Sequence, residues 1–390
     1  MRSEYRESAA EFTGFASTKT IFIFRPKTTT MRLLVFLLLF TAFGCNESAD
    51  QNATGDDWAM TGFQRIADNP VLTPGDGVFH CPLRGEEVAW EAKDVFNPAA
   101  VVRGDTVWMI YRAEDTVGIH AGTSRLGLAW SLDGEHFKRL PEPVFYPDND
   151  SMQVYEWEGG VEDPRIVETD EGLYIMTYTA YDGKIARLCL ASSKDLIEWQ
   201  KHGLVLGAGK FRNTWSKSGS IVCRREGNRL LATKVNGKYW MYWGDTDIFA
   251  ATSKDLIHWE PVLDEEGEIR PVFGPRPGMF DCQLVEPGPP ALLTDDGILL
   301  IYNSRNLDEG GDPALPPGTY TAGQVLLDAT DPLRVVNRLD HYFFKPEFEF
   351  EKTGQVGNVV FLEALVPFRG QWFLYYGTAD SKIAAARREM

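Results

Sequence analysis

Basic residues are scarce in this chain of 390 residues. Its 39 Lys and Arg stand against 56 Asp and Glu, which gives a formal net charge of -17. A nucleic-acid-binding protein needs a basic surface to neutralise phosphates, so the composition argues against that class. The 11 Trp and 14 Tyr suit a neutral sugar partner, although most of these rings are expected in a β-sheet core.

Cysteine and histidine are also few, with five and six residues. Apart from Cys45, the cysteines show no metal-ligand spacing and are too few for a disulfide framework. We predict that these four are buried thiols: Cys81, Cys189, Cys223 and Cys282. The histidines show no metal-ligand spacing either, so no metal or other cofactor is expected.

An apolar run near the N-terminus, residues 33–43, is too short to span a bilayer as a helix. Met31-Arg32 precedes it and Gly44-Cys45 follows, a pattern typical of a bacterial lipoprotein export signal. We expect Met31 to be the true start, Cys45 to carry the only membrane attachment, and the protein to be periplasmic or on the cell surface. The predicted parts are an export signal (1–45), a flexible tether (46–60) and a catalytic domain (61–390).

Sustained helical periodicity is missing, and a short repeat takes its place. Ser131-Leu-Asp133, Ser193-Lys-Asp195 and Ser253-Lys-Asp255 place their aspartates 62 and then 60 residues apart, and residues 325–334 hold a blurred fourth copy. This interval suits a four-stranded blade with its loops. We interpret the repeated phrase as a blade-end turn capped by its aspartate, with a following Trp packed between blades.

Runs of β-branched and aromatic residues accompany the repeat, and most follow a Gly/Asp turn. They lie at residues 106–112, 173–179, 238–243, 298–302 and 371–376. Five such units predict an all-β fold, a five-bladed β-propeller, with residues 63–72 closing the ring against the last blade at 382–386.

Polar residues near the start of each unit are expected to converge in a central funnel. The candidates are Asn97, Asp163, Lys217, Glu286 and Glu363. Three carboxylates around one pit would repel one another and raise at least one pKa, as a general acid requires. Glu162 and Asp163 are adjacent on an extended backbone, so we expect them to point to opposite sides, with Glu162 paired to an arginine.

Several motifs follow one another in a fixed order: Phe96-Asn-Pro-Ala-Ala100, Ile110-Tyr-Arg112, Gly160-Val-Glu-Asp-Pro-Arg-Ile166, Glu286-Pro-Gly-Pro-Pro290, Asn358-Val-Val-Phe361 and Tyr375-Tyr-Gly-Thr-Ala-Asp380. Over residues 63–386 this set resembles glycoside hydrolase family 130. The resemblance implies a five-bladed propeller that cleaves β-mannosides with inversion, by phosphorolysis or hydrolysis. It also implies that Asp163 is the proton donor, acting through a substrate hydroxyl, and that Asn97, Arg112 and Asp380 hold the mannosyl ring.

Phosphorolysis requires clustered basic donors for a phosphate dianion. Phosphorylases of the resembled family carry a His-Arg pair and a His where this chain has Tyr242-Trp243 and Asn303-Ser304. Glu286 and Glu363 would repel phosphate but are suited to deprotonating a water. We therefore predict hydrolysis of β-mannosides, β-1,2-linked manno-oligosaccharides in particular, which also suits an exported enzyme. Asp163 is the predicted acid, and one or both glutamates activate water.

Alternatives stay open at three basic residues and for the function itself. Arg112 either binds substrate or pairs with Glu114 or Glu162, Arg165 either binds substrate or orients carboxylates, and Lys217 contacts substrate or forms a salt bridge. The alternative functions are a β-mannoside phosphorylase and a non-catalytic glycan-binding propeller.

Overall fold

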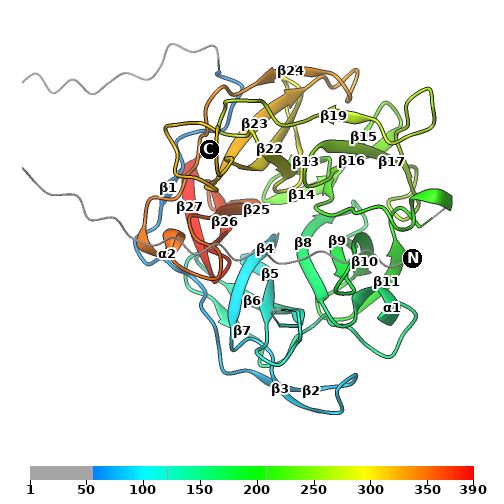
Figure 1. The fold of residues 1–390 in the computed structure, drawn as a ribbon, viewed down its shortest axis with the longest axis vertical. Helices are drawn as coiled ribbons and strands as arrows, with labels where there is room; N and C mark the ends of the chain where they lie inside the picture. Colours follow the sequence, from blue (N-terminus) through cyan, green and yellow to red (C-terminus); the bar gives the residue numbers. More distant parts are fainter. Residues whose placement is uncertain (1–55, 121, 208) are drawn as a thin grey trace, which may run out of the picture. The chain divides into compact units, whose positions relative to one another are not determined.

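Strands make up nearly all the regular structure of the chain (Figure 1). The computed structural model describes residues 56–120, 122–207 and 209–390, which all belong to one unit, Thr54–Met390. Helical structure within them is limited to single turns: α1 (Gln153–Glu156), α2 (Glu349–Lys352) and a 3-10 turn (Gly209–Phe211). No helix in this part of the chain has the length and apolar character needed to cross a membrane. The predicted all-β class is confirmed, whereas the export signal and Cys45 lie outside the described residues.

Successive strands pair into antiparallel meanders. The first meander comprises β4 (Asp94–Arg103), β5 (Thr106–Glu114), β6 (Ser124–Ser131) and β7 (Lys138–Arg139). The second comprises β8 (Gly160–Glu168), β9 (Tyr174–Tyr181), β10 (Ala186–Ser193) and β11 (Trp199–Leu204). The third comprises β12 (Ser220–Ile221), β15 (Lys234–Val235), β16 (Lys238–Trp243), β17 (Ile248–Ser253), β18 (Trp259–Pro261) and β19 (Pro271–Phe273).

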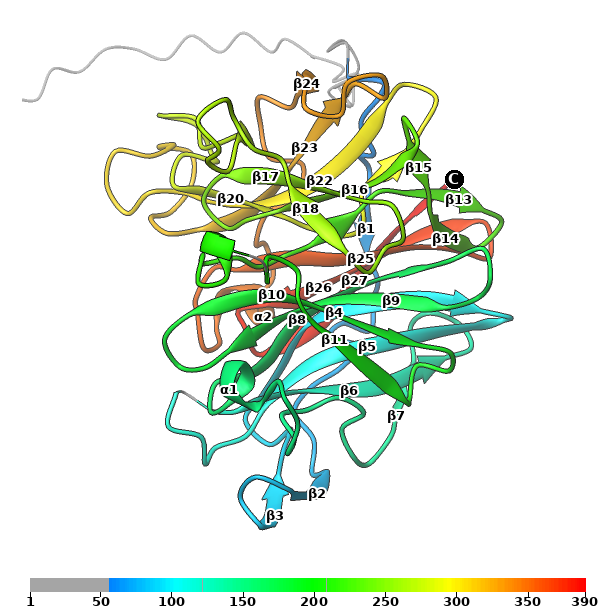
Figure 2. The same cartoon turned by 90° about the vertical axis from the view of Figure 1, so that its right-hand side faces the viewer.

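Two further meanders and two hairpins complete the described strands. The fourth meander comprises β20 (Leu284–Pro287), β21 (Leu292–Leu293), β22 (Ile298–Arg305), β23 (Tyr320–Leu327) and β24 (Val335–Arg338). The fifth comprises β25 (Val360–Phe368), β26 (Gln371–Thr378), β27 (Lys382–Glu389) and β1 (Gln64–Arg65). The hairpins are β2 (Val78–Cys81) with β3 (Glu86–Ala89), which projects at one end of the unit (Figure 2), and β13 (Cys223–Glu226) with β14 (Arg229–Ala232).

Parallel pairings of one residue each connect several of these meanders. Ser124 of β6 pairs with Gly160 of β8, Leu231 of β14 with Glu168, and Cys223 of β13 with Leu292. The first, second and fourth meanders therefore form one 15-stranded sheet with the hairpin β13–β14. Among the described residues no sheet closes on itself. The five-bladed ring thus stays a prediction.

The strand predictions agree with the structure. The five predicted runs fall within or across β5, β9, β16, β22 and β26. The N-terminal segment also meets the last strand, because β1 pairs with β27 and Leu72 bridges Ile383. Burial on both faces explains the nearly continuous apolar and aromatic run of β26, because side chains on either face of the strand are covered.

The repeated Ser-x-Asp phrase forms the predicted turn. In all three copies the serine hydroxyl accepts the aspartate N–H, and the aspartate Oδ1 accepts the N–H groups of the residues two and three positions after it. Leu196 and Leu256 adopt positive φ angles of 72° and 69° there. Trp199 and Trp259 donate to the carbonyl groups of these leucines, which attaches each turn to its sheet. The cysteine prediction is also confirmed, because all four thiols are free and buried.

Candidate active site

The first strands of three meanders share an irregularity at the same place. The pairing register shifts between Phe96 and Pro98 in β4, between Glu162 and Arg165 in β8, and between Leu362 and Ala364 in β25. The residues at these bulges are the predicted site residues Asn97, Asp163 and Glu363. A β-bulge turns a side chain away from the regular alternation of its strand. Since β4, β8 and β25 lie beside one another near the middle of Figure 1, the three bulges bring these side chains together.

Asp163 lies at the centre of this group and is 2% exposed. Its Oδ1 accepts hydrogen bonds from Asn97 Nδ2 at 2.9 Å and from Arg112 Nη1 at 3.0 Å. Lys217 Nζ lies 3.3 Å from its Oδ2. Asn97 and Asp163 hold positive φ angles of 48° and 49°, a strained conformation for residues with a Cβ that is typical of functional sites.

One prediction about this cluster is wrong. Glu162 and Asp163 do not point to opposite sides, because Arg112 Nη2 donates to Glu162 at 2.9 Å while Arg112 Nη1 donates to Asp163. The positive φ of Asp163 within the bulge breaks the alternation on which the prediction relied. The expected pairing of Glu162 with an arginine is confirmed.

Arg112 has all three guanidinium nitrogens engaged. Besides Asp163 and Glu162, it donates to Glu114 at 2.8 Å and to Ser124 Oγ at 3.0 Å. The predicted ion-pair role is thus confirmed, and it places the Arg112 guanidinium directly against the central carboxylate. Asp380, in the turn after β26, has a φ of 50° and interacts electrostatically with Arg112 and Asp163.

Lys217 connects the central carboxylate to the fourth meander. Its Nζ is 3.3 Å from Asp163 Oδ2 and 3.3 Å from Glu286 Oε1. One ammonium therefore holds the two carboxylates within about twice that distance. Because this is an upper limit, the facing oxygens lie no further apart than about the 6.5 Å lower end of the range for acid and base groups in inverting glycosidases. The Ser218 hydroxyl also donates to Glu286.

Arg165 is 1% exposed and positions other groups of the site. Its three nitrogens donate to backbone carbonyls of Gly288, Asp163 and Pro287 at 2.9, 3.0 and 2.8 Å. Its Nη2 is also 3.1 Å from Glu363 Oε1, an ion-pair distance that lacks hydrogen-bond geometry. Of the two predicted roles, these contacts support the orienting of carboxylates.

The carboxyl groups of the site differ in acidity. Burial alone would raise the pKa of Asp163, but Lys217, Arg112 and Arg165 together outweigh it and hold that pKa well below its usual range. Burial raises the pKa of Glu162 and of Asp380 to about 7, against the opposing effect of Arg112. Burial also raises the pKa of Glu286, against the opposing effect of Lys217.

The pKa of Glu363 lies well above its usual range because the group is buried, and Arg165 offsets this only in part. Neither Glu363 oxygen has a hydrogen-bond partner, and its side chain is 0% exposed. Asp163 and Glu286 raise the pKa of Glu363 further, as the predicted repulsion between carboxylates requires, although burial is the larger cause. The group predicted as the acid, Asp163, nevertheless has a lowered pKa, which favours its ionised form.

Sequence reasoning missed three contributors. Ser218 has a positive φ of 60° and bonds Glu286, Asp245 acts electrostatically on Lys217 and Glu286, and Asn303 bonds both backbone groups of Leu362 at 3.0 and 2.7 Å. The Asn303 contacts fix the chain next to the Glu363 bulge. The family motifs mark Asn303 only as the replacement of a phosphorylase histidine, and no periodic signal marks the structural roles of the three residues, because these roles depend on pairing between meanders.

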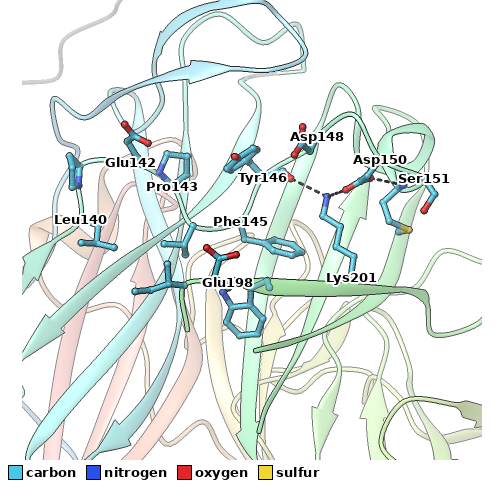
Figure 3. A pocket seen from close by; sticks show the side chains of 15 residues that line it. Leu140, Glu142, Pro143, Phe145, Tyr146, Asp148, Asp150, Ser151, Glu198 and Lys201 are labelled. Carbon is cyan, nitrogen blue, oxygen red and sulfur yellow. Dashed lines mark hydrogen bonds and ion pairs between the residues drawn. The ribbon is translucent and has the colours of Figure 1, made fainter. Parts of the chain in front are cut away.

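A groove of about 700 Å³ lies elsewhere on the unit, lined by parts of residues 140–152 and 197–201 (Figure 3). Lys201 in this groove pairs with Asp150 at 3.0 Å. None of the predicted site residues lines it. Within the described part of the chain no group of His, Cys, Asp and Glu is arranged to hold a metal ion. The bulge-centred cluster is therefore the candidate active site.

A family model described as beta-1,4-mannooligosaccharide phosphorylase, Glyco_hydro_130, matches residues 64–390. The chain belongs to glycoside hydrolase family 130. A 1,2-beta-oligomannan phosphorylase from Thermoanaerobacter sp. (strain X514) is 35% identical, over 85% of this chain and 98% of the relative. The family resemblance of the motifs is thus confirmed.

Solved structures of family 130 extend the comparison. A glycosyl hydrolase from Bacteroides ovatus is 48% identical, with a TM-score of 0.84 over 87% of this chain and 96% of that one. A second structure comes from work on glycoside hydrolases of the GH130 family that target β-1,2 mannosidic linkages in Candida mannan. It is also 48% identical, with a TM-score of 0.84 over 85% of this chain and 95% of that one. The family model and the curated relatives favour phosphorolysis, the alternative in the sequence analysis, over the predicted hydrolysis.

Proposed function

We propose that the protein cleaves β-1,2-linked manno-oligosaccharides with inversion, and that water is the acceptor. The observation that carries the proposal is the Lys217 ammonium, which contacts Asp163 and Glu286 at 3.3 Å each and so opposes two carboxylates across one pit. Inverting hydrolysis needs one carboxyl group to protonate the leaving oxygen and a second to deprotonate water on the opposite face of the sugar. The family and its β-1,2-mannoside relatives support the substrate class.

Asp163 is the proposed acid. In the empty site it is ionised, because Lys217 and Arg112 lower its pKa. A mannosyl ring that fills the pit removes water and weakens the Lys217 contact, and both changes raise the pKa of Asp163. The protonated carboxyl then gives its proton to the leaving oxygen, directly or through a sugar hydroxyl. Asn97, Arg112 and Asp380 surround Asp163 and hold the ring in this proposal.

Glu286 is better suited than Glu363 to activate water. Lys217 and the Ser218 hydroxyl both stabilise the ionised form of Glu286. Glu363 has no hydrogen-bond donor on either oxygen, and burial raises its pKa well above the usual range, which favours its neutral form. We therefore assign the base role to Glu286 and a neutral, space-filling role to Glu363.

Charge in the pit supports water as the acceptor. The cations Arg112, Arg165 and Lys217 already contact carboxylates or backbone carbonyls. A phosphate dianion would have to compete with these groups and would meet the repulsion of Asp163, Glu286 and their neighbours. The second candidate function is phosphorolysis, which the names of the curated relatives favour.

The proposal extends to the architecture and the location. Five antiparallel meanders, with the first strands β4, β8 and β25 in contact, suit a five-bladed propeller whose funnel holds the site. The sequence from Met31 to Cys45 supports export and lipid attachment at Cys45, with the site outside the cytoplasm.

Replacement of Asp163 tests the acid assignment. We expect Asp163→Asn to reduce turnover of β-1,2-mannobiose by about 10² to 10⁴-fold, the usual contribution of a general acid. Asp148→Asn, in the groove of Figure 3, is the matched control and should leave turnover unchanged. Unchanged turnover of Asp163→Asn would reject the assignment.

A further inference from the structure

Two aromatic side chains lie beside the strand that carries Asp163. Tyr181 ends β9 and pairs across the sheet with Gly160, three residues before Asp163. Its ring lies so close to Gly159 that a Cβ built there would be 2.3 Å from the ring. Trp215 stands next to Tyr181, with ring centroids 6.4 Å apart at 68°. The site residues occupy the beginnings of β8, β20 and β25, and Tyr181 lies at that same end of its sheet.

Trp215 is exposed yet held in a fixed position. Trp215 is 49% exposed. The neighbouring Ser216 is hydrogen-bonded to β10. The Ser216 N–H donates to Ala186 O at 3.0 Å, and its hydroxyl accepts the Leu188 N–H at 3.0 Å. The indole Nε1 donates to Asp245 Oδ2 at 2.6 Å. An ordered, exposed indole offers a flat apolar face to a ligand.

The Trp215 indole is also connected to the site through its hydrogen-bond partner. Asp245, its hydrogen-bond partner, acts electrostatically on both Lys217 and Glu286. The chain around Asp245 lies between these groups, because the Gly244 N–H donates to Lys217 O and the Val285 N–H to Thr246 O. Tyr181 thus lies beside the start of the strand that carries Asp163, and Trp215 lies two residues before Lys217, which contacts Asp163 and Glu286.

We infer that Trp215 and Tyr181 form the binding subsite for the leaving part of the substrate, a neutral pyranose that stacks on the indole. This inference rests on the proposed function. The acid protonates the leaving oxygen, so the leaving sugar must lie on the side of Asp163, where these rings are. A pyranose presents an apolar C–H face to an aromatic ring and hydroxyl groups to polar neighbours, which suits an indole beside Asp245.

Kinetics of Trp215→Ala on two substrates test the subsite. β-1,2-Mannobiose has a leaving sugar, whereas β-mannosyl fluoride leaves as fluoride and has none. We expect the variant to raise KM for mannobiose about 5- to 10-fold with kcat little changed, the effect of losing one aromatic contact. The kcat/KM for the fluoride should fall far less. Tyr181→Ala should show the same selectivity.

Trp130→Ala is the matched control, because Trp130 is a half-buried tryptophan whose ring packs 6.0 Å from Trp108 in the first meander. Trp130→Ala should leave the kinetics of both substrates unchanged. Thermal unfolding measured on every variant shows whether it folds. An equal loss on both substrates, or no loss on mannobiose, overturns the subsite. Failure of the unmodified protein to cleave either substrate refutes the proposed function itself, and the subsite with it.

Discussion

Separate replacement of Glu286 and Glu363 by glutamine distinguishes the two candidate bases. Glutamine keeps the size of the side chain and is always neutral. Burial and the lack of donors favour the neutral form of the Glu363 carboxyl group, and Glu363→Gln resembles that form. Glu286→Gln instead removes a carboxylate that Lys217 and Ser218 stabilise in its ionised form. The two variants should therefore differ strongly in turnover.

The expected size of the difference follows from these roles. Loss of a general base costs about 10² to 10⁴-fold in rate, so Glu286→Gln should lower kcat for β-1,2-mannobiose about 10³-fold. This corresponds to about 4 kcal/mol of activation free energy. Glu363→Gln should lower kcat by about tenfold or less, since only packing and the 3.1 Å contact with Arg165 change.

Initial rates of mannose release measure both effects, with Glu198→Gln in the separate groove as the matched control. Azide, a small anionic nucleophile, should restore part of the activity of Glu286→Gln and yield an α-mannosyl azide, since it replaces water without needing a base. Near-native turnover of Glu286→Gln, or a larger loss in Glu363→Gln, would refute the assignment.

Three other predictions concern the site and its scaffold. Arg112→Lys should lower kcat/KM by about 10²-fold, because one ammonium cannot reproduce the forked contacts to Asp163, Glu162 and Glu114; near-native kinetics would contradict this. The Tm of Glu363→Gln should rise relative to that of the native protein as pH increases above ~4.5. The reason is that a carboxyl group with a raised folded-state pKa makes the native protein lose stability between the unfolded and folded pKa values. A constant Tm difference between the two proteins across that range would exclude the raised pKa. Asp195→Ala and Asp255→Ala should each cost about 1 kcal/mol of unfolding free energy in urea titrations without changing kcat, because each removes equivalent turn hydrogen bonds; a loss in only one of the two would argue against equivalent turns.

Much of the fold could be predicted from the sequence because it depends on local patterns. Runs of β-branched and aromatic residues predict strands such as 371–376, which lies in β26, and the Ser-x-Asp phrase predicts a turn whose hydrogen bonds lie within six residues. The pairings that connect different meanders, such as Leu231 with Glu168, carry no local signal. They depend on contacts between residues distant in the chain.

The sequence predicts which residues form the site better than it predicts how their side chains are arranged. Asn97, Asp163 and Glu363 are polar residues near the starts of the predicted units, and each lies at a bulge of its strand. The predicted direction of the Glu162 side chain is wrong, because side chains stop alternating regularly at a bulge. The low pKa of Asp163 was also unforeseen, since it depends on Lys217, 54 residues further along the chain.

Product analysis tests the central claim most directly. The purified protein is incubated with β-1,2-mannobiose with and without inorganic phosphate, and the first-formed sugar is observed by NMR before it mutarotates. Inverting hydrolysis predicts α-mannose as the first product, at equal rates with and without phosphate. Mannose 1-phosphate formed only with phosphate would contradict hydrolysis and establish the phosphorylase alternative, and β-mannose as the first product would contradict inversion.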